Sequence, residues 1–129
     1  MRMILSLAAA AALVLLPFTA AADSPLKTVH YRTAYHLTHP NISAGDYTGV
    51  MMLQFYTSGI INGNYRDDSA GTIVTVTGGF SGSKVWLSIG TKGRRQMNGT
   101  LEKDGSIKGT LSNWNGPDVY AFQAVPTAP

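Results

Sequence analysis

The sequence contains no cysteine among its 129 residues, and charged residues make up only 13%. The absence of cysteine excludes a disulfide-stapled scaffold, a thiol nucleophile and a lipid-modified N-terminal cysteine. The basic cluster at residues 92–95, Lys-Gly-Arg-Arg, is too short to form the dense basic stripe that a nucleic-acid-binding protein of this size carries. We therefore expect no nucleic acid partner.

Long apolar runs are also lacking, apart from one near the N-terminus. Residues 1–3, Met-Arg-Met, precede an Ala- and Leu-rich run at 4–16, which Pro17 ends. Residues 20–22 are three alanines, the small residues that a signal peptidase recognises. The run is shorter than the roughly 20 residues of a membrane-spanning helix. The pattern predicts a signal peptide at residues 1–22 and an exported domain at 23–129, located in the periplasm or outside the cell and not spanning a membrane.

The rest of the chain shows no helical periodicity over three turns. It shows short runs in which apolar and polar residues alternate, separated by Gly-, Asn- and Asp-rich turns, and Asp104-Gly105 is the strongest two-residue hairpin signal. The expected strands cover residues 29–37, 46–57, 61–65, 72–80, 84–89, 95–102, 106–112 and 119–125. We predict an all-β domain, an antiparallel up-and-down meander of about eight strands closed into a small barrel.

A glycine between two apolar residues of the same strand face recurs along these strands. The pattern apolar-x-Gly-x-apolar is centred on Gly49, Gly63, Gly78, Gly99 and Gly109. Because side chains alternate along a strand, each of these glycines faces the core. Inward glycines either let the sheet coil sharply or leave space for a ligand. Both readings stay open from the sequence.

An eight-stranded barrel is either filled by its own side chains or holds one small ligand. Large residues of the expected inner face could fill the barrel or line such a site. The candidate ligand-binding residues are Tyr47, Met51, Tyr65, Phe80 and Met97.

Two segments carry a resemblance to a known family. Residues 59–65, Gly-Ile-Ile-Asn-Gly-Asn-Tyr, fit the pattern Gly-x-apolar-x-Gly-x-Tyr, and residues 105–111 form a weaker copy. This rhythm resembles the avidin and streptavidin family of calycin-type meander barrels, which implies a closed barrel. Of the family's biotin site only Tyr65 is matched, because Arg66 and Asp67 stand where a serine is expected. Two tryptophans are also too few for its aromatic box. The resemblance implies the architecture and argues against biotin binding.

Patterns that would indicate catalysis or metal binding are missing. Residues 79–83, Gly-Phe-Ser-Gly-Ser, lack the final glycine of a nucleophile elbow. Six of the seven carboxylates fall in expected turns or at the terminus. His30 and His36 share a strand face but lie about 20 Å apart, too far to share a metal. We expect no catalytic residue, metal or cofactor.

The two tryptophans fall on the expected outer face. Trp86 lies between Val85 and Leu87, which face inward, and Trp114 follows the outward phase of its strand. Exposed tryptophan is enriched at interfaces. The sequence thus supports two functions. One is a non-catalytic binding module for a small apolar ligand. The other is a protein-interaction module, an inhibitor of a secreted enzyme or a self-associating subunit, which uses Trp86, Trp114, Arg94 and Arg95. The other outward positions are polar, which excludes a lipid-facing barrel.

Overall fold

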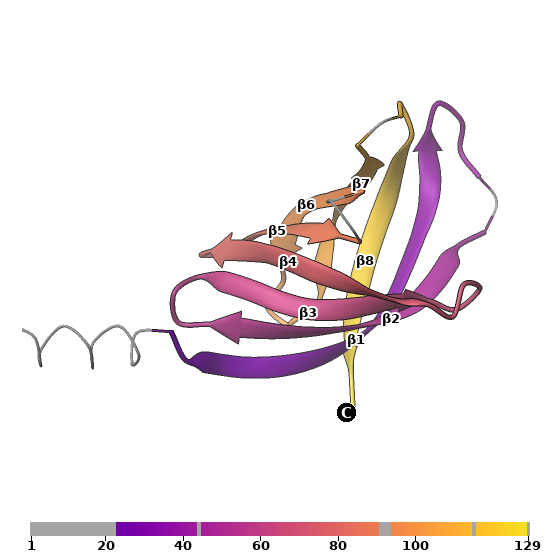
Figure 1. Ribbon diagram of the computed structural model, residues 1–129. Helices are drawn as coiled ribbons and strands as arrows, with labels where there is room; N and C mark the ends of the chain where they lie inside the picture. The colour runs from indigo at the N-terminus through magenta and orange to yellow at the C-terminus, as the bar shows by residue number, and fades with distance from the viewer. Residues whose placement is uncertain (1–22, 44, 91–93, 115, 129) are drawn as a thin grey trace, which may run out of the picture.

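The structure, a computed structural model, describes residues 23–43, 45–90, 94–114 and 116–128, so the expected leader at residues 1–22 lies outside the described residues. Every strand pairs antiparallel with its neighbours in the sequence, and β8 pairs with β1 to close a barrel (Figure 1). The strands are β1 (Pro25–His39), β2 (Tyr47–Tyr56), β3 (Ile60–Asp67), β4 (Ile73–Ser81), β5 (Lys84–Ile89), β6 (Arg95–Leu101), β7 (Ile107–Asn113) and β8 (Val119–Thr127). The predicted eight-stranded up-and-down barrel is confirmed, and its architecture is calycin-like.

Alternation of side chains between the two faces of the wall accounts for this arrangement. In β5, Val85, Leu87 and Ile89 are buried, whereas Trp86 is 45% exposed on the outer face. The hairpin predicted at Asp104-Gly105 joins β6 to β7: Gly105 has a φ of 90°, a conformation that glycine adopts at no steric cost. In the described ranges, no helix is long and apolar enough to cross a membrane.

The inward glycines mark places where neighbouring strands approach closely. A Cβ atom on Gly63 would lie 1.9 Å from the carbonyl oxygen of Met52 in β2, and one on Gly109 would lie 2.1 Å from the carbonyl oxygen of Asn98 in β6. Backbone of the adjacent strand thus occupies the space beside these two glycines. Of the two readings that the sequence left open, the structure supports sheet coiling rather than a ligand cavity.

The barrel interior is filled by side chains. The largest fully buried apolar side chains are aromatic and aliphatic residues of β1 to β7: Tyr31, Leu53, Phe55, Ile61, Val76, Val85, Leu87, Met97, Ile107 and Leu111. One end of the barrel, which we call the closed end, is where β2–β3, β4–β5 and β6–β7 connect. There the rings of Phe55 and Phe80 pack edge to face with centroids 5.5 Å apart, and Lys27 Nζ lies 5.0 Å from the Phe55 centroid.

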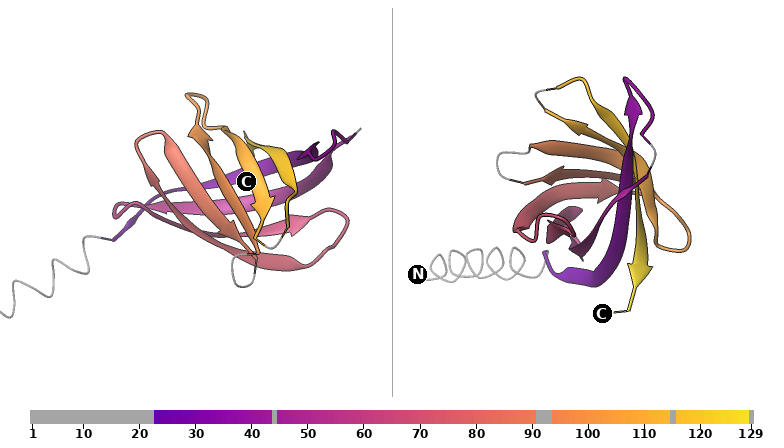
Figure 2. Two further views of the ribbon diagram at one scale, coloured as in Figure 1. Left: turned by 90° about the horizontal axis from the view of Figure 1, so that it is seen from above. Right: turned by 90° about the vertical axis from the view of Figure 1, so that its right-hand side faces the viewer.

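The opposite end, which we call the mouth, is where β1–β2, β3–β4, β5–β6 and β7–β8 connect. The right-hand view of Figure 2 shows the barrel turned toward this end. Polar and amphipathic side chains gather at the mouth beside apolar ones, in contrast to the phenylalanines at the closed end. The candidate site lies at the mouth.

Candidate functional site

Four side chains from three strands meet at the mouth and form the mouth cluster: Tyr35 of β1, Tyr65 and Asp67 of β3, and Arg95 of β6. The Tyr65 hydroxyl donates a short hydrogen bond to Asp67 Oδ1, and the Tyr35 hydroxyl donates to the same oxygen at 3.3 Å. Arg95 Nη1 donates to the Tyr35 hydroxyl at 2.9 Å and lies 3.6 Å from Asp67 Oδ2. The cluster therefore joins two phenols, a carboxylate and a guanidinium in one network.

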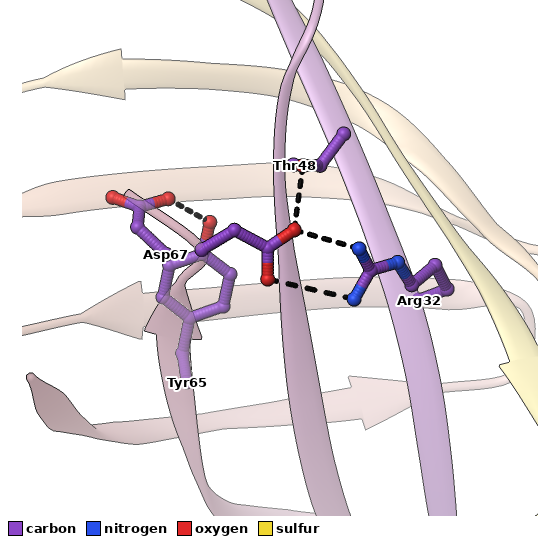
Figure 3. A network of polar contacts seen from close by, with 5 residues as sticks. Arg32, Thr48, Tyr65 and Asp67 are labelled. Carbon is purple, nitrogen blue, oxygen red and sulfur yellow. Dashed lines mark hydrogen bonds and ion pairs between the residues drawn. The ribbon is translucent and has the colours of Figure 1, made fainter. Parts of the chain in front are cut away.

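Asp67, the last residue of β3, and Asp68, which follows it, make contacts on different sides of the wall. Figure 3 shows the contact between Tyr65 and Asp67, with Arg32 and Thr48 nearby. Asp67 reaches Tyr65 on the inner side, whereas Asp68 Oδ2 accepts hydrogen bonds from Arg32 Nη2 and Thr48 Oγ1, each at 2.6 Å. Arg32 and Asp68 are solvent-accessible, so this outer ion pair adds little stability. Its effect is local: it links the middle of β1 to the start of β2 and to the residue after β3, beside the mouth cluster.

Gly49 makes room for the cluster. A Cβ atom at this position would lie 2.6 Å from the Arg66 carbonyl oxygen, 2.9 Å from the Tyr65 hydroxyl and 3.1 Å from Thr33 Oγ1. Because glycine has no Cβ atom, the Tyr65 side chain can cross this position and its hydroxyl can reach Asp67. The Thr33 hydroxyl beneath it is buried and makes no hydrogen bond to the described residues.

Burial and neighbouring charge determine the protonation of the cluster. Burial raises the pKa of Tyr65, and the hydrogen bond to Asp67 and its negative charge raise it further. Burial also raises the pKa of Tyr35, with Arg95 opposing the shift and Asp67 adding to it. Burial alone would lower the pKa of Arg95, but its contacts with Tyr35 and Asp67 outweigh that effect and the pKa is raised. Both phenols therefore stay protonated, and Arg95 stays charged, well above neutral pH.

A cleft of about 390 Å³ opens beside the cluster. Tyr65, Asp67 and Arg95 form its polar side, and Val74 of β4 and Ile89 of β5 form an apolar wall. The rest of the lining comes from the adjoining connections: Ala70, Thr72, Gly90 and Arg94. The cleft can therefore offer a small molecule both an apolar surface and hydrogen-bond donors.

Further tyrosines surround the cluster. The Tyr47 ring stacks on Tyr35, with centroids 5.3 Å apart and an interplanar angle of 27°. The Tyr120 ring of β8 meets Tyr35 edge-on at 5.4 Å. Tyr35 is thus held on both sides, which fixes the position of its hydroxyl within the cluster.

The predicted ligand-binding residues do not form one site. Tyr65 lines the cleft, but Met51 and Met97 lie in the filled core, 2% and 0% exposed, and Phe80 packs at the closed end. Tyr47 differs from its expected place in the interior, because it is 55% exposed at the rim of the mouth. It is the first residue of β2, where the wall no longer covers an inward side chain.

The predicted interface residues are likewise divided. Trp86 of β5 is in register with Asn98 of β6, and Asn98 is in register with Thr110 of β7. Trp114 lies four residues after Thr110. That spacing puts the two indoles about 13 Å apart along the strand direction. Trp114 instead lies at the mouth, where its backbone nitrogen donates to the Arg94 carbonyl at 3.0 Å. Arg94 and Arg95 line the mouth cleft, so neither belongs to the surface around Trp86.

Sequence reasoning missed Tyr35 and Asp67. Extending the phase of Ile61, Gly63 and Tyr65 by two residues places Asp67 on the inner face, yet the run at 67–71 resembles a polar loop. The alternation of residues along this strand was therefore the one sequence signal that could have identified Asp67. Among the described residues, no group of three or more His, Asp or Glu side chains could hold a metal ion. Comparisons with protein-family models, curated proteins and solved structures find no match to this chain.

Proposed function

We propose that this protein is a non-catalytic binding module that holds a small ligand at the mouth of its barrel. The observation that carries the proposal is the half-buried mouth cluster beside a cleft with apolar walls. Ligand sites are typically concave, largely apolar and equipped with a few converging polar groups. With the expected export signal at residues 1–22, the ligand would be met in the periplasm or outside the cell.

The packing of the interior supports a site at the mouth rather than inside the barrel. Met97 has no solvent-sized space beside it, and Gly63 and Gly109 face backbone rather than a cavity. The cluster also favours binding over catalysis. The Asp67 carboxylate already accepts hydrogen bonds from two phenols and pairs with Arg95, so it is not a free base.

The resemblance to the avidin and streptavidin family gives limited support. Tyr65, the residue at the motif's tyrosine position, lines the cleft, and this agrees with a ligand site at the mouth. The absent serine and the small number of tryptophans argue against biotin as the ligand.

The test is an NMR screen of the exported domain with a library of small fragments, compared between two variants of β4. Val74→Trp fills the cleft, whereas Thr75→Trp adds the same ring at an exposed position on the outer face. We expect fragment-induced shifts to concentrate at residues 65–74 and 89–95, to disappear in the first variant and to persist in the second. Hits that map elsewhere, or a screen without hits, would refute the proposal.

Interaction with a protein is the second candidate function, favoured by the exposure of Trp86. The Trp86 indole lies over Gly79, whose Cβ would come 2.8 Å from the indole Cζ2, so one side of the ring already covers the sheet. Its register neighbour Asn98 is polar. A surface formed by one indole among polar side chains is small for an interface, and we rank this function second.

A further inference from the structure

We propose that the ligand of the mouth cleft is a small carboxylate with an apolar body, bound through the guanidinium of Arg95 with help from Arg94. This inference rests on the proposed binding function and specifies the chemistry of its ligand. Three features support it: the unused donors of Arg95, the balance of charge around the cleft, and the size and polarity of its walls.

Arg95 is held in place by one of its three nitrogens. Nη1 donates to the Tyr35 hydroxyl and approaches Asp67, and the guanidinium carbon lies 5.4 Å from the centroid of the Tyr35 ring. Within the described part of the chain, Nε and Nη2 have no partner, although the side chain is only 33% exposed. A guanidinium fixed in this way presents a planar pair of donors that matches the two oxygens of a carboxylate.

The charges around the cleft favour an anion. Arg94 and Arg95 contribute two positive charges and Asp67 contributes one negative charge. Asp67 is 18% exposed, and its oxygens accept from both phenols and face Arg95. An ammonium group in the cleft would therefore meet two guanidinium groups and a carboxylate that is already occupied. A carboxylate would meet the free edge of Arg95.

The remaining walls define the body of the ligand. Val74, Ile89 and Ala70 provide apolar surface at the cleft. The volume of about 390 Å³ accommodates on the order of ten non-hydrogen atoms, if each takes about 30 Å³ as a water molecule does in the liquid. These dimensions fit a medium-chain or aromatic monocarboxylate. A phosphate ester carries more charge, and the apolar side of the cleft supplies no further donors for it.

The experiment titrates the domain with octanoate, octanol, octylamine and octyl phosphate, one at a time at neutral pH, and follows backbone amide shifts by NMR. We expect octanoate to perturb the residues of the cleft and to bind at least tenfold more tightly than the other three probes. Arg95→Gln should weaken octanoate binding at least tenfold. Arg95→Lys keeps the charge but loses the planar pair of donors. Its affinity for octanoate should lie between those of the parent protein and the Arg95→Gln variant.

Two further variants separate binding from folding. Arg94→Gln leaves the mouth cluster intact and should weaken octanoate binding several-fold with no loss of thermal stability. The matched control is Arg66→Gln, an exposed arginine on the outer face of β3, which should leave octanoate binding unchanged.

The outcomes distinguish this inference from the proposed function. Octanol, octylamine or octyl phosphate binding in the cleft as tightly as octanoate would overturn the carboxylate inference and leave a ligand site at the mouth. Octanoate binding that is insensitive to Arg94 and Arg95 would overturn it as well, and so would the absence of any shift at the cleft with millimolar octanoate. The proposed function itself is refuted only if the fragment screen also finds no ligand that Val74→Trp excludes.

Discussion

Replacing Gly63 by alanine places a methyl group where β2 and β3 come closest together. The new Cβ would lie 1.9 Å from the Met52 carbonyl oxygen and 3.0 Å from the Leu53 Cα, both of which are backbone atoms. No rotamer change can relieve this overlap. Because β3 pairs with β4 on its other side, it cannot move away from β2 without straining the second ladder.

The magnitude follows from two opposing effects. Overpacking of a well-packed site costs about 1–3 kcal/mol and occasionally more, and a clash with backbone belongs to the upper part of that range. The lower entropy of the unfolded alanine chain returns about 0.4–1 kcal/mol. We therefore expect Gly63→Ala to lower the free energy of unfolding by about 1–2.5 kcal/mol.

Urea unfolding of the domain at residues 23–129, followed by fluorescence, measures this change. For a domain of this size the expected loss lowers the urea midpoint by about 0.5–2 M and the Tm by about 5–15 °C. The matched control is Asn62→Ala, one residue away and exposed on the outer face, which should change the free energy of unfolding by at most about 0.5 kcal/mol. Equal losses in the two variants would show that Gly63 does not face the β2 backbone and that the assigned register is wrong.

Two further predictions concern the aromatic residues. Burial raises the pKa of Tyr31 to about 12, and Tyr35 and Tyr65 are also shifted upward from 10.0, so the folded state holds more protons than the unfolded state above pH 10. The stability that these phenols contribute is therefore present below pH 10 and lost as the pH rises, by about 2–3 kcal/mol for Tyr31 alone between pH 10 and 12. The absorbance change at 295 nm from these three phenols should coincide with the loss of the circular dichroism signal, and ionisation of all three before unfolding would contradict the assignment. Trp86→Ser should destabilise the monomer by about 1–2 kcal/mol, because roughly half of the indole is covered. Sedimentation velocity of the parent protein tests whether it associates with itself. If it is monomeric at high concentration, self-association through Trp86 is refuted.

Local patterns were sufficient to predict the strands. The alternation in β5, with Val85, Leu87 and Ile89 inward, is a property of consecutive residues, and the predicted range 84–89 matches the strand in the structure. The end of β1 shows the limit of such patterns. The strand runs to His39 rather than ending at residue 37, because its backbone pairs with β8 there, and that pairing depends on the closed barrel.

The mouth cluster could not be predicted in the same way. Tyr35 and Asp67 are 32 residues apart, and Tyr35 and Arg95 are 60 residues apart, so their contacts follow from the strand registers and not from spacing along the chain. Arg95 illustrates the consequence. In the sequence it belongs to an exposed basic run, whereas in the structure its neighbours are two side chains from other strands. Reading the phase of β3 one step further would have identified Asp67 alone, without its partners.

The two ends of the barrel provide the last reason to place function at the mouth. The closed end is sealed by Phe55 and Phe80, with the side chain of Lys27 lying across the Phe55 ring. Such a seal buries apolar area, which stabilises the fold directly. At the mouth, the same chain buries a carboxylate, a guanidinium and two phenols, and desolvating these groups offsets much of what their contacts contribute. If stability alone decided, apolar side chains would be expected to fill both ends of the barrel. A polar cluster that is preorganised, half-buried and open to a cleft therefore supports the proposed ligand site at the mouth.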